Sequence, residues 1–227
     1  MERRGFFITV EGGDGAGKST QLSKLKEYMQ DKGFDTVFTR EPGGTDIGEK
    51  VRKIILDVNN KEMAYHTEAY LYAASRAQNV RQVIRPALEK GKVVICDRFV
   101  DSSIAYQGFG RGLGKDRVWS INKDAVDDCM PDLTIFLDVD PIEASLRVEG
   151  REGQKDRLEI SGESFHEKVY LGYKELIAEQ ESGVIWYDGR ISNHPRMVSV
   201  KANRLPEEVW ETIKEILDER MKGFGER

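Results

Sequence analysis

The chain has 227 residues, of which 39% are hydrophobic and 33% charged, and its formal net charge is −5. This length fits one domain better than two, and the charge gives no overall attraction for nucleic acid or an anionic membrane. The two cysteines, Cys96 and Cys129, are too few for a disulfide framework and have no metal-binding spacing, so we expect a reducing, cytoplasmic setting. The first apolar run ends at Glu11 and is too short for an export signal or a membrane span.

Short apolar runs alternate with longer segments of helical period, which is typical of an α/β protein with a parallel sheet. Their near-continuous apolar character suits strands that are covered by helices on both faces. A run at 184–187 also qualifies as the last strand, but we favour 197–200 and interpret 184–196 as a possible insertion. The predicted strands are 6–10, 36–39, 93–96, 133–137 and 197–200. The expectation is one domain, residues 1–227, with a five-stranded parallel sheet in three layers.

Helical periodicity fills the segments between these strands. Pro86 is expected to bend or end the third helix early, because proline lacks the N–H that a helix interior needs. Glycine-rich stretches at 43–44, 108–114 and 150–153 are predicted to be mobile or substrate-facing loops. The predicted helices are 18–32, 47–58, 65–90, 116–127, 142–149, 163–181 and 206–222.

Residues 12–19 read Gly-Gly-Asp-Gly-Ala-Gly-Lys-Ser and match the P-loop pattern G-x-x-x-x-G-K-[ST]. The motif follows a predicted strand and opens a predicted helix, so its backbone N–H groups and the helix N-terminus can surround a phosphate. Lys18 is expected to reach the β- and γ-phosphates of ATP, and Ser19 to place its hydroxyl on Mg²⁺. The predicted nucleotide-binding residues here are Gly12, Gly13, Asp14, Gly15, Ala16, Gly17, Lys18, Ser19 and Thr20.

Charged residues follow two more predicted strands. Asp97 ends the third strand, where a second carboxylate can act on the metal directly or through water. Arg40 and Arg98 lie just past strand ends, at the edge where open α/β sheets bind ligands. Two guanidinium groups there suit a second phosphate, so we predict an acceptor that already bears one.

A nucleotide switch of the GTPase kind is the non-enzymatic alternative. Such a protein reads guanine through N-K-x-D, and residues 122–125 read Asn-Lys-Asp-Ala. The last position is Ala125 instead of Asp, and the segment lies within an amphipathic helical stretch. We therefore interpret Asn122 as part of a helix surface.

In order and spacing, several segments together resemble the thymidylate kinases of the P-loop nucleoside-monophosphate kinase group. These segments are Val-Glu-Gly-Gly-Asp-Gly-Ala-Gly-Lys-Ser-Thr20, Arg-Glu-Pro-Gly-Gly-Thr45, Tyr-Ala-Ala-Ser-Arg76, Asp-Arg-Phe99 and Ser-Ser-Ile-Ala-Tyr-Gln-Gly108. The resemblance implies a P-loop kinase fold and transfer of the ATP γ-phosphate to dTMP with Mg²⁺, giving dTDP and ADP for dTTP synthesis by a homodimer. A kinase of UMP, CMP or AMP is the nearest alternative. A deoxynucleoside kinase is more distant, because it needs a carboxylate base, for which Glu41 is the candidate.

The resemblance also implies roles for individual residues. Asp14 would bind the sugar 3′-hydroxyl, Arg40 and Arg98 the acceptor phosphate, and Asp97 the metal or its waters. Tyr72 stands where the family usually has Phe and would stack on thymine, with Arg76 on a base carbonyl. The remaining acceptor contacts would be Ser103 and Gln107 with the base and Tyr106 beneath the sugar, where it excludes a 2′-hydroxyl. Phe99 replaces the usual Tyr of that motif. Tyr65 and Tyr70 are better explained as core or helix-packing aromatics.

The basic segment 147–158 is predicted to be a lid over ATP, although charged runs are more often solvated loops. One branch of the family places a catalytic Arg in the P-loop directly after the Asp, and another places it in the lid. Gly15 occupies that P-loop position here, so the chain resembles the lid-Arg branch. We favour Arg151 and then Arg157 as catalytic, together with Lys18 and Arg98. Nucleotide contacts are further expected from Arg147 and from Asn203 after the last strand.

Overall fold

The computed structural model describes residues 5–150, 156–181 and 194–224. All the strand pairs are parallel, and the sheet has the order β2-β3-β1-β4-β5. All five predicted strands are confirmed, and each is one residue longer at its carboxyl end than predicted. The favoured last strand at 197–200 is among them. The strands are β1 (Phe6–Glu11), β2 (Thr36–Arg40), β3 (Val93–Asp97), β4 (Leu133–Asp138) and β5 (Met197–Lys201).

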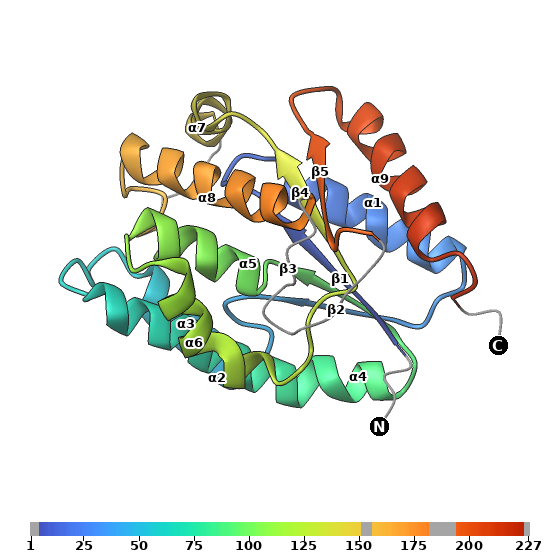
Figure 1. The fold of residues 1–227 in the computed structure, drawn as a ribbon, viewed down its shortest axis with the longest axis horizontal. Coiled ribbons are helices and arrows are strands. Elements are labelled where there is room, and N and C mark those ends of the chain that lie inside the picture. Colours follow the sequence, from blue (N-terminus) through green and yellow to red (C-terminus); the bar gives the residue numbers. More distant parts are fainter. Residues whose placement is uncertain (1–4, 151–155, 182–193, 225–227) are drawn as a thin grey trace.

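Helices cover both faces of the sheet and give three layers (Figure 1). On one face lie α1 (Lys18–Asp31) and α9 (Pro206–Arg220), whose Leu25 and Ile213 pack in one core with Ile8 of β1. The other elements are α2 (Asp46–Leu56), α3 (Tyr65–Asn79), η1 (Val80–Ile84), α4 (Arg85–Glu89), α5 (Val100–Ser103), η2 (Ile104–Gly110), α6 (Lys115–Val126), α7 (Pro141–Glu149) and α8 (Glu163–Glu181).

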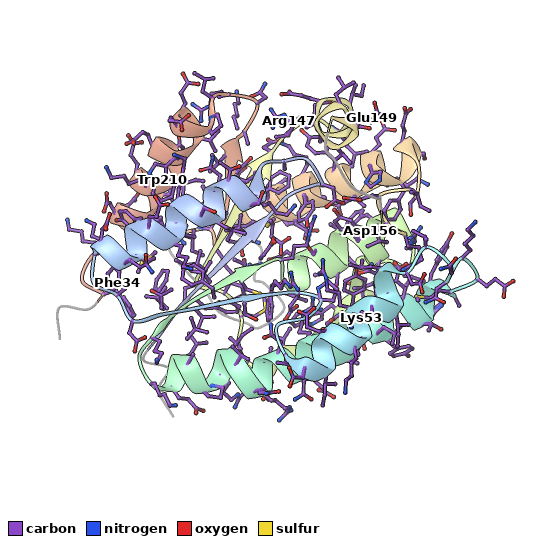
Figure 2. The ribbon with its side chains drawn as sticks, turned by 180° about the vertical axis from the view of Figure 1, so that it is seen from behind. Phe34, Lys53, Arg147, Glu149, Asp156 and Trp210 are labelled. Atoms are coloured by element: carbon purple, nitrogen blue, oxygen red, sulfur yellow. The ribbon has the colours of Figure 1, made fainter. Side chains whose placement is uncertain are left out.

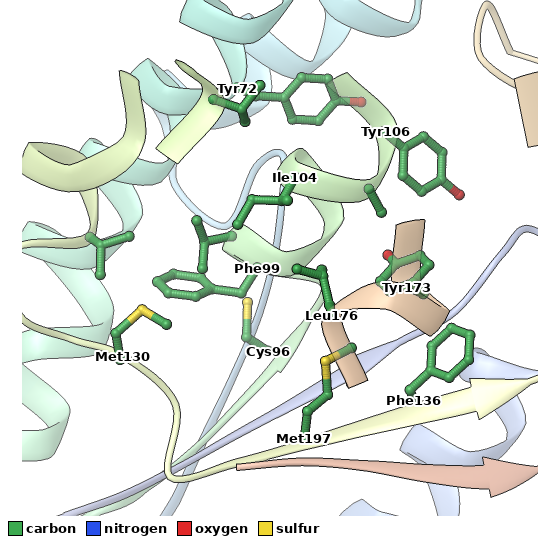
Figure 3. Close-up of a cluster of buried hydrophobic side chains, with 14 of the residues drawn as sticks. Tyr72, Cys96, Phe99, Ile104, Tyr106, Met130, Phe136, Tyr173, Leu176 and Met197 are labelled. Atoms are coloured by element: carbon green, nitrogen blue, oxygen red, sulfur yellow. The ribbon is translucent and has the colours of Figure 1, made fainter. Parts of the chain in front are cut away.

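A second core fills the opposite face, because alternate strand residues point there. Phe7 lies in this core while its neighbour Ile8 lies in the first one. Figure 3 shows part of the second core, with Tyr72 and Tyr106 above Phe99 in the view. The expectation that helices cover both faces of the sheet is thus confirmed, with one apolar core on each face.

The segment expected to be a glycine-rich loop at 108–114 begins inside a helix. Residues 100–110 form α5 and the π-helical η2, and only the residues after Gly110 form a loop. η2 packs closely on α8: a Cβ added at Gly172 would lie 2.8 Å from the Phe109 ring. Gly110, one of the glycines that suggested a loop, also lies against α8. A Cβ added there would lie 2.6 Å from the Phe165 ring.

The helix expected at 65–90 continues past Pro86 instead of ending before it. The turn ahead of the proline is π-helical: the Arg85 N–H bonds to the Val80 carbonyl, five residues back. A wider turn of this kind gives room for the proline ring, which clashes with a neighbouring carbonyl in a regular α-helix.

Two tyrosines on this helix also differ from expectation, because Tyr65 and Tyr70 are 51% and 61% exposed and belong to neither of the two described cores.

Of the segment interpreted as an insertion, 184–196, only 194–196 lies within the described residues. Arg196 is anchored there: its guanidinium donates two hydrogen bonds of 2.8 Å to the buried carboxylate of Asp101 in α5.

No helix in the described ranges has both the length and the apolar character that a bilayer crossing requires.

Candidate active site

The carboxyl ends of three strands meet at one edge of the sheet. The register pairs Asp97 of β3 with Val10 of β1 on one side and with Arg40 of β2 on the other. The P-loop follows β1 directly, so it begins at the same edge of the sheet as Asp97. This is the edge where open parallel sheets bind ligands.

The P-loop lysine, Lys18, hydrogen-bonds to the backbone of its own loop. Lys18 begins α1 and donates from Nζ to the carbonyl oxygens of Gly12 at 3.0 Å and Gly13 at 2.9 Å. Burial and the neighbouring Arg98 lower the pKa of Lys18 to about 8, against the opposing pull of nearby carboxylates. A phosphate in the loop would supply the negative charge that favours the protonated ammonium.

Arg98, Asp14 and Tyr106 form one cluster beside the P-loop. The Arg98 guanidinium donates to Asp14 at 2.8 Å and lies 5.0 Å above the Tyr106 ring, and the Tyr106 hydroxyl donates to the other Asp14 oxygen at 3.4 Å. Arg98 has a φ of 67°, an uncommon conformation for a residue with a side chain, and it points the guanidinium at Asp14. Burial alone would raise the pKa of Asp14, but Arg98 and Lys18 lower it below its usual value. Three residues predicted for the acceptor site are thus in contact.

A narrow pocket opens beside this cluster, and we call it the acceptor pocket. It contains five of the residues that the sequence indicated for the acceptor base and sugar, namely Asp14, Tyr72, Arg76, Tyr106 and Gln107. It is lined by Asp14, Glu41, Pro42, Arg52, Leu56, Tyr72, Arg76, Arg98, Phe99, Ser102, Tyr106, Gln107, Asp156 and Leu158. Ser103, also indicated for the base, is not among the lining residues.

Arg76 forms part of the pocket wall and is itself 1% exposed. Its guanidinium donates to Glu41 at 2.8 Å, to Ser103 at 3.1 Å and to Asn122, and it lies 5.2 Å from the centre of the Phe99 ring. The interpretation of Asn122 as helix surface is therefore wrong. Residue 122 lies in α6, as expected for a helix, but it faces inward because it accepts from Arg76.

Glu41, the candidate base of the rival kinase, is committed to this network. It is buried, and it pairs with Arg76 and accepts a further bond from Asn79 at 3.2 Å. Burial raises the pKa of Glu41, and the two partners oppose that rise. Although Glu41 is among the residues that line the acceptor pocket, both of its carboxylate oxygens are already bonded, one to Arg76 and the other to Asn79.

Arg40 is placed differently from Arg98. Its side chain is 54% exposed and makes two hydrogen bonds to Glu49 of α2, and it is not among the residues lining the acceptor pocket. Instead Arg52 of α2 lines the pocket and donates to the Pro42 carbonyl at 2.9 Å. Sequence reasoning missed Arg52, since a single arginine in an amphipathic helix has no distinguishing signal.

The two ends of the predicted lid lie on different sides of the cleft. Arg147, in α7, donates to the Ala202 carbonyl at 3.3 Å and to the Gly15 carbonyl at 3.5 Å, which places it between the P-loop and the loop that carries the exposed Asn203. Figure 2 shows Arg147 on α7 and Asp156 lower in the view. Arg151 lies outside the described residues.

The far end of the lid is on the acceptor side. Arg157 is buried, donates to the Ile55 carbonyl at 2.7 Å and pairs with Glu68 at 2.7 Å. Its neighbours Asp156 and Leu158 line the acceptor pocket. In this conformation the Arg157 guanidinium is held against α2 and α3, and it would have to leave Glu68 to reach a transferring phosphate.

A buried carboxylate oxygen marks the predicted metal position. Asp97 Oδ1 is buried and has no hydrogen-bond partner within the described residues, which is the environment of an oxygen that a cation can bind. Ser19, the other predicted metal residue, lies in the first turn of α1 with an exposed side chain. Nowhere in the described parts do three or more His, Cys, Asp or Glu side chains cluster as a protein-only metal site would require. Two protein oxygens completed by nucleotide phosphates fit Mg²⁺.

Glu11, at the end of β1, was not singled out from the sequence. Its buried carboxylate accepts from the Phe99 N–H at 2.7 Å, the Ser102 hydroxyl at 2.5 Å and the Tyr173 hydroxyl at 2.8 Å. It thereby joins β1 to the segment that carries Arg98. Burial and the nearby Asp101 raise the pKa of Glu11 to about 7.

A larger cavity of about 630 Å³ lies between α7 and α8 and reaches the P-loop at Asp14.

Together, the sheet order, the loop after the first strand and the arginine-lined acceptor pocket define a P-loop nucleotide kinase. The family model for thymidylate kinase matches residues 10–193. The chain therefore belongs to the thymidylate kinase family.

Individual relatives agree with this placement. A thymidylate kinase of Oceanobacillus iheyensis is 44% identical over 220 residues, which is 96% of this chain and 94% of the relative. One from an Exiguobacterium species is 50% identical over 184 residues, 81% of this chain and 86% of the relative. One from Lactobacillus delbrueckii subsp. bulgaricus is 53% identical over 175 residues, 76% and 82% of the two chains.

Proposed function

We propose that this chain transfers the γ-phosphoryl group of ATP to dTMP, giving dTDP and ADP. The observation that carries the proposal is the cluster of Arg98, Asp14 and Tyr106 between the P-loop and the acceptor pocket. An arginine suits the acceptor phosphate, and Asp14 suits a sugar hydroxyl. Tyr106 beside Asp14 narrows the space for a 2′-hydroxyl, which favours deoxyribose.

The chemistry needs no strong general base, because an oxygen of the acceptor phosphate is already ionised. That oxygen forms the new bond to the γ-phosphorus, and the bond to the ADP oxygen breaks. Lys18 and Arg98 neutralise the charge on the transferring group and hold the two phosphates in line. Ser19 and Asp97 are the residues that would hold Mg²⁺, which supplies further charge neutralisation when bound.

Other roles extend the proposal. Tyr72 would stack on the base, with Arg76, Ser103 and Gln107 providing its polar surroundings. Arg40 would join Arg98 at the acceptor phosphate after leaving Glu49. On the ATP side, Arg147 and Asn203 would contact the nucleotide, and the lid would close over it.

We also propose a cytoplasmic homodimer. Cys96 and Cys129 are both buried, which fits a reducing compartment. Large apolar side chains lie exposed on neighbouring helices, Ile47 and Ile54 of α2 and Tyr70 of α3, which is the character of a surface that a second copy can cover.

The test is an ADP-release assay across dTMP, dUMP, UMP, AMP and thymidine as acceptors. We expect dTMP to have the highest kcat/KM. A higher value for UMP or AMP would make the chain a different monophosphate kinase, and a higher value for thymidine would make it a nucleoside kinase. Glu41 argues against the last outcome, because its carboxylate is already paired with Arg76.

A further inference from the structure

Glu68 is a buried carboxylate that the proposed reaction does not use. It lies on α3 with 0% of its surface exposed, and it is not among the residues that line the acceptor pocket. Three side chains donate to it or pair with it: Gln107 at 2.9 Å, Arg111 at 3.2 Å and Arg157 at 2.7 Å. A carboxylate between two guanidinium groups acts as an acceptor on both oxygens.

Gln107 connects Glu68 to the acceptor pocket. It lies in η2, is fully buried and is one of the residues that line the pocket. Its amide Nε2 donates to Glu68, and its Oε1 is buried without a hydrogen-bond partner in the described parts of the chain.

The orientation of this amide follows from the chemistry of Glu68. A glutamine side chain can present either its NH₂ or its oxygen to a neighbour, and the two orientations have nearly the same shape. A carboxylate has no proton to donate, so only the orientation with Nε2 toward Glu68 forms a hydrogen bond. The Gln107 oxygen is then the atom left for the pocket.

A buried carbonyl oxygen without a partner costs free energy, and a ligand N–H removes that cost. Thymine and uracil carry an N–H at ring position 3, next to carbonyl oxygens. Cytosine has a bare acceptor nitrogen at that position and an exocyclic amine donor beside it. An oxygen held opposite ring position 3 therefore accepts a hydrogen bond from thymine or uracil, whereas in cytosine it faces the lone pair of the bare ring nitrogen.

We propose that Glu68 is a positioning residue for base selection: it fixes the Gln107 amide with Oε1 toward the base, so that the enzyme selects a ring N–H and discriminates against dCMP. This inference rests on the proposed function, since it names how the same pocket reads its acceptor. Glu68 does not touch the substrate and acts through Gln107.

The decisive variant is Glu68→Gln. A glutamine at 68 can accept from Gln107 or donate to it, so both orientations of the Gln107 amide become possible. We expect the ratio of kcat/KM for dTMP over dCMP to fall about tenfold, the order of one lost hydrogen bond. The KM for dTMP should rise. The variant also loosens the pairing of residue 68 with Arg157, and any effect of that on kcat is common to both acceptors and leaves the ratio unchanged.

Glu68→Asp is the matched control, because aspartate still only accepts. It shortens the side chain and weakens the packing, so the melting temperature should fall, yet the dTMP to dCMP ratio should stay close to that of the wild type. If both variants lose the same selectivity, Glu68 is merely structural and the proposal is wrong.

A double-mutant cycle tests the route through Gln107. Gln107→Leu should lose the discrimination by itself, and adding Glu68→Gln should lower the ratio no further. An equal further loss in the Gln107→Leu background would overturn the proposal. Should Glu68→Gln not fold, unchanged discrimination in Gln107→Leu alone would overturn it too.

The wild-type assays keep the two proposals apart. If the wild type prefers UMP or thymidine to dTMP, the proposed function fails whatever the variants do. If the wild type prefers dTMP and Glu68→Gln keeps the full preference over dCMP, only the role of Glu68 fails.

Discussion

Glu11 illustrates how a single residue can tie the nucleotide loop to the acceptor side. Its carboxylate receives hydrogen bonds from Phe99, Ser102 and Tyr173, and two of these flank or follow Arg98 in the chain. Ser102 in turn accepts from Arg98 at 3.3 Å. The protonation state of Glu11 therefore affects the hydrogen-bond network that positions Arg98.

The stability of the protein should depend on that proton. Burial raises the pKa of Glu11 from its ordinary value of 4.5 to about 7 in the folded chain. Between these values the folded state holds the proton more tightly than the unfolded state, so this contribution is present at low pH and is lost as pH rises to 7. Relative to Glu11→Gln, we expect the free energy of unfolding of the wild type to fall by about 2–3 kcal/mol from pH 5 to 7.5.

Urea unfolding of both proteins at a series of pH values, without nucleotide, measures this difference. Comparison with Glu11→Gln cancels the other titrating groups, since they are present in both proteins. A difference that stays flat or grows with pH would contradict a raised pKa at Glu11.

At the scale of elements, the P-loop packs directly against α7, the helix that carries the start of the predicted lid. Gly15 has a φ of 85°, and a Cβ added there would lie 2.2 Å from the Ala144 carbonyl oxygen. A side chain at this position therefore requires α7 to move. This packing gives a physical reason why an arginine at position 15 does not fit here, which agrees with our prediction that the lid supplies the catalytic arginine.

Gly15→Ala should accordingly destabilise the chain, by about 2 kcal/mol or more, from the strained φ and the clash together. Gly13→Ala is the control within the same loop, because a Cβ there meets nothing within 4 Å. Thermal and urea unfolding without nucleotide compare the two. Equal losses of stability would mean that the contact between α7 and position 15 is unimportant.

The lid prediction concerns Arg151, which lies outside the described residues. If the lid supplies the cation for the transferring phosphoryl group, Arg151→Ala should lower kcat strongly and leave the KM for dTMP nearly unchanged. Steady-state kinetics with dTMP varied at saturating ATP give both constants. A near-normal kcat would exclude Arg151 from this role.

Across the whole molecule, the sheet was predictable because buried parallel strands are apolar throughout and end in polar residues at one edge. The helical segment 100–110 was not, because its Gly108 and Gly110 are indistinguishable from loop glycines until α8 is seen against them. The passage of the long helix through Pro86 depended on a π-helical turn, which has no sequence signature.

The site divides in the same way. Arg98 was predictable because it follows a strand, and strand ends meet at one edge. Asp14 was predictable because it lies in the P-loop motif, and its role at the acceptor sugar was implied by the family resemblance. The ion pairs of the site were not predictable. The pairing of Arg40 with Glu49 and of Arg76 with Glu41 depends on how α2 and α3 pack. Tertiary contacts of that kind are absent from local sequence patterns.

The most direct test of the central claim is a competition in one reaction. Limiting radiolabelled ATP is mixed with equal concentrations of dTMP, UMP, dCMP and thymidine, and the labelled products are separated by chromatography. We predict that dTDP carries nearly all of the transferred label. A majority of the label in UDP or dCDP, or in dTMP formed from thymidine, would contradict it.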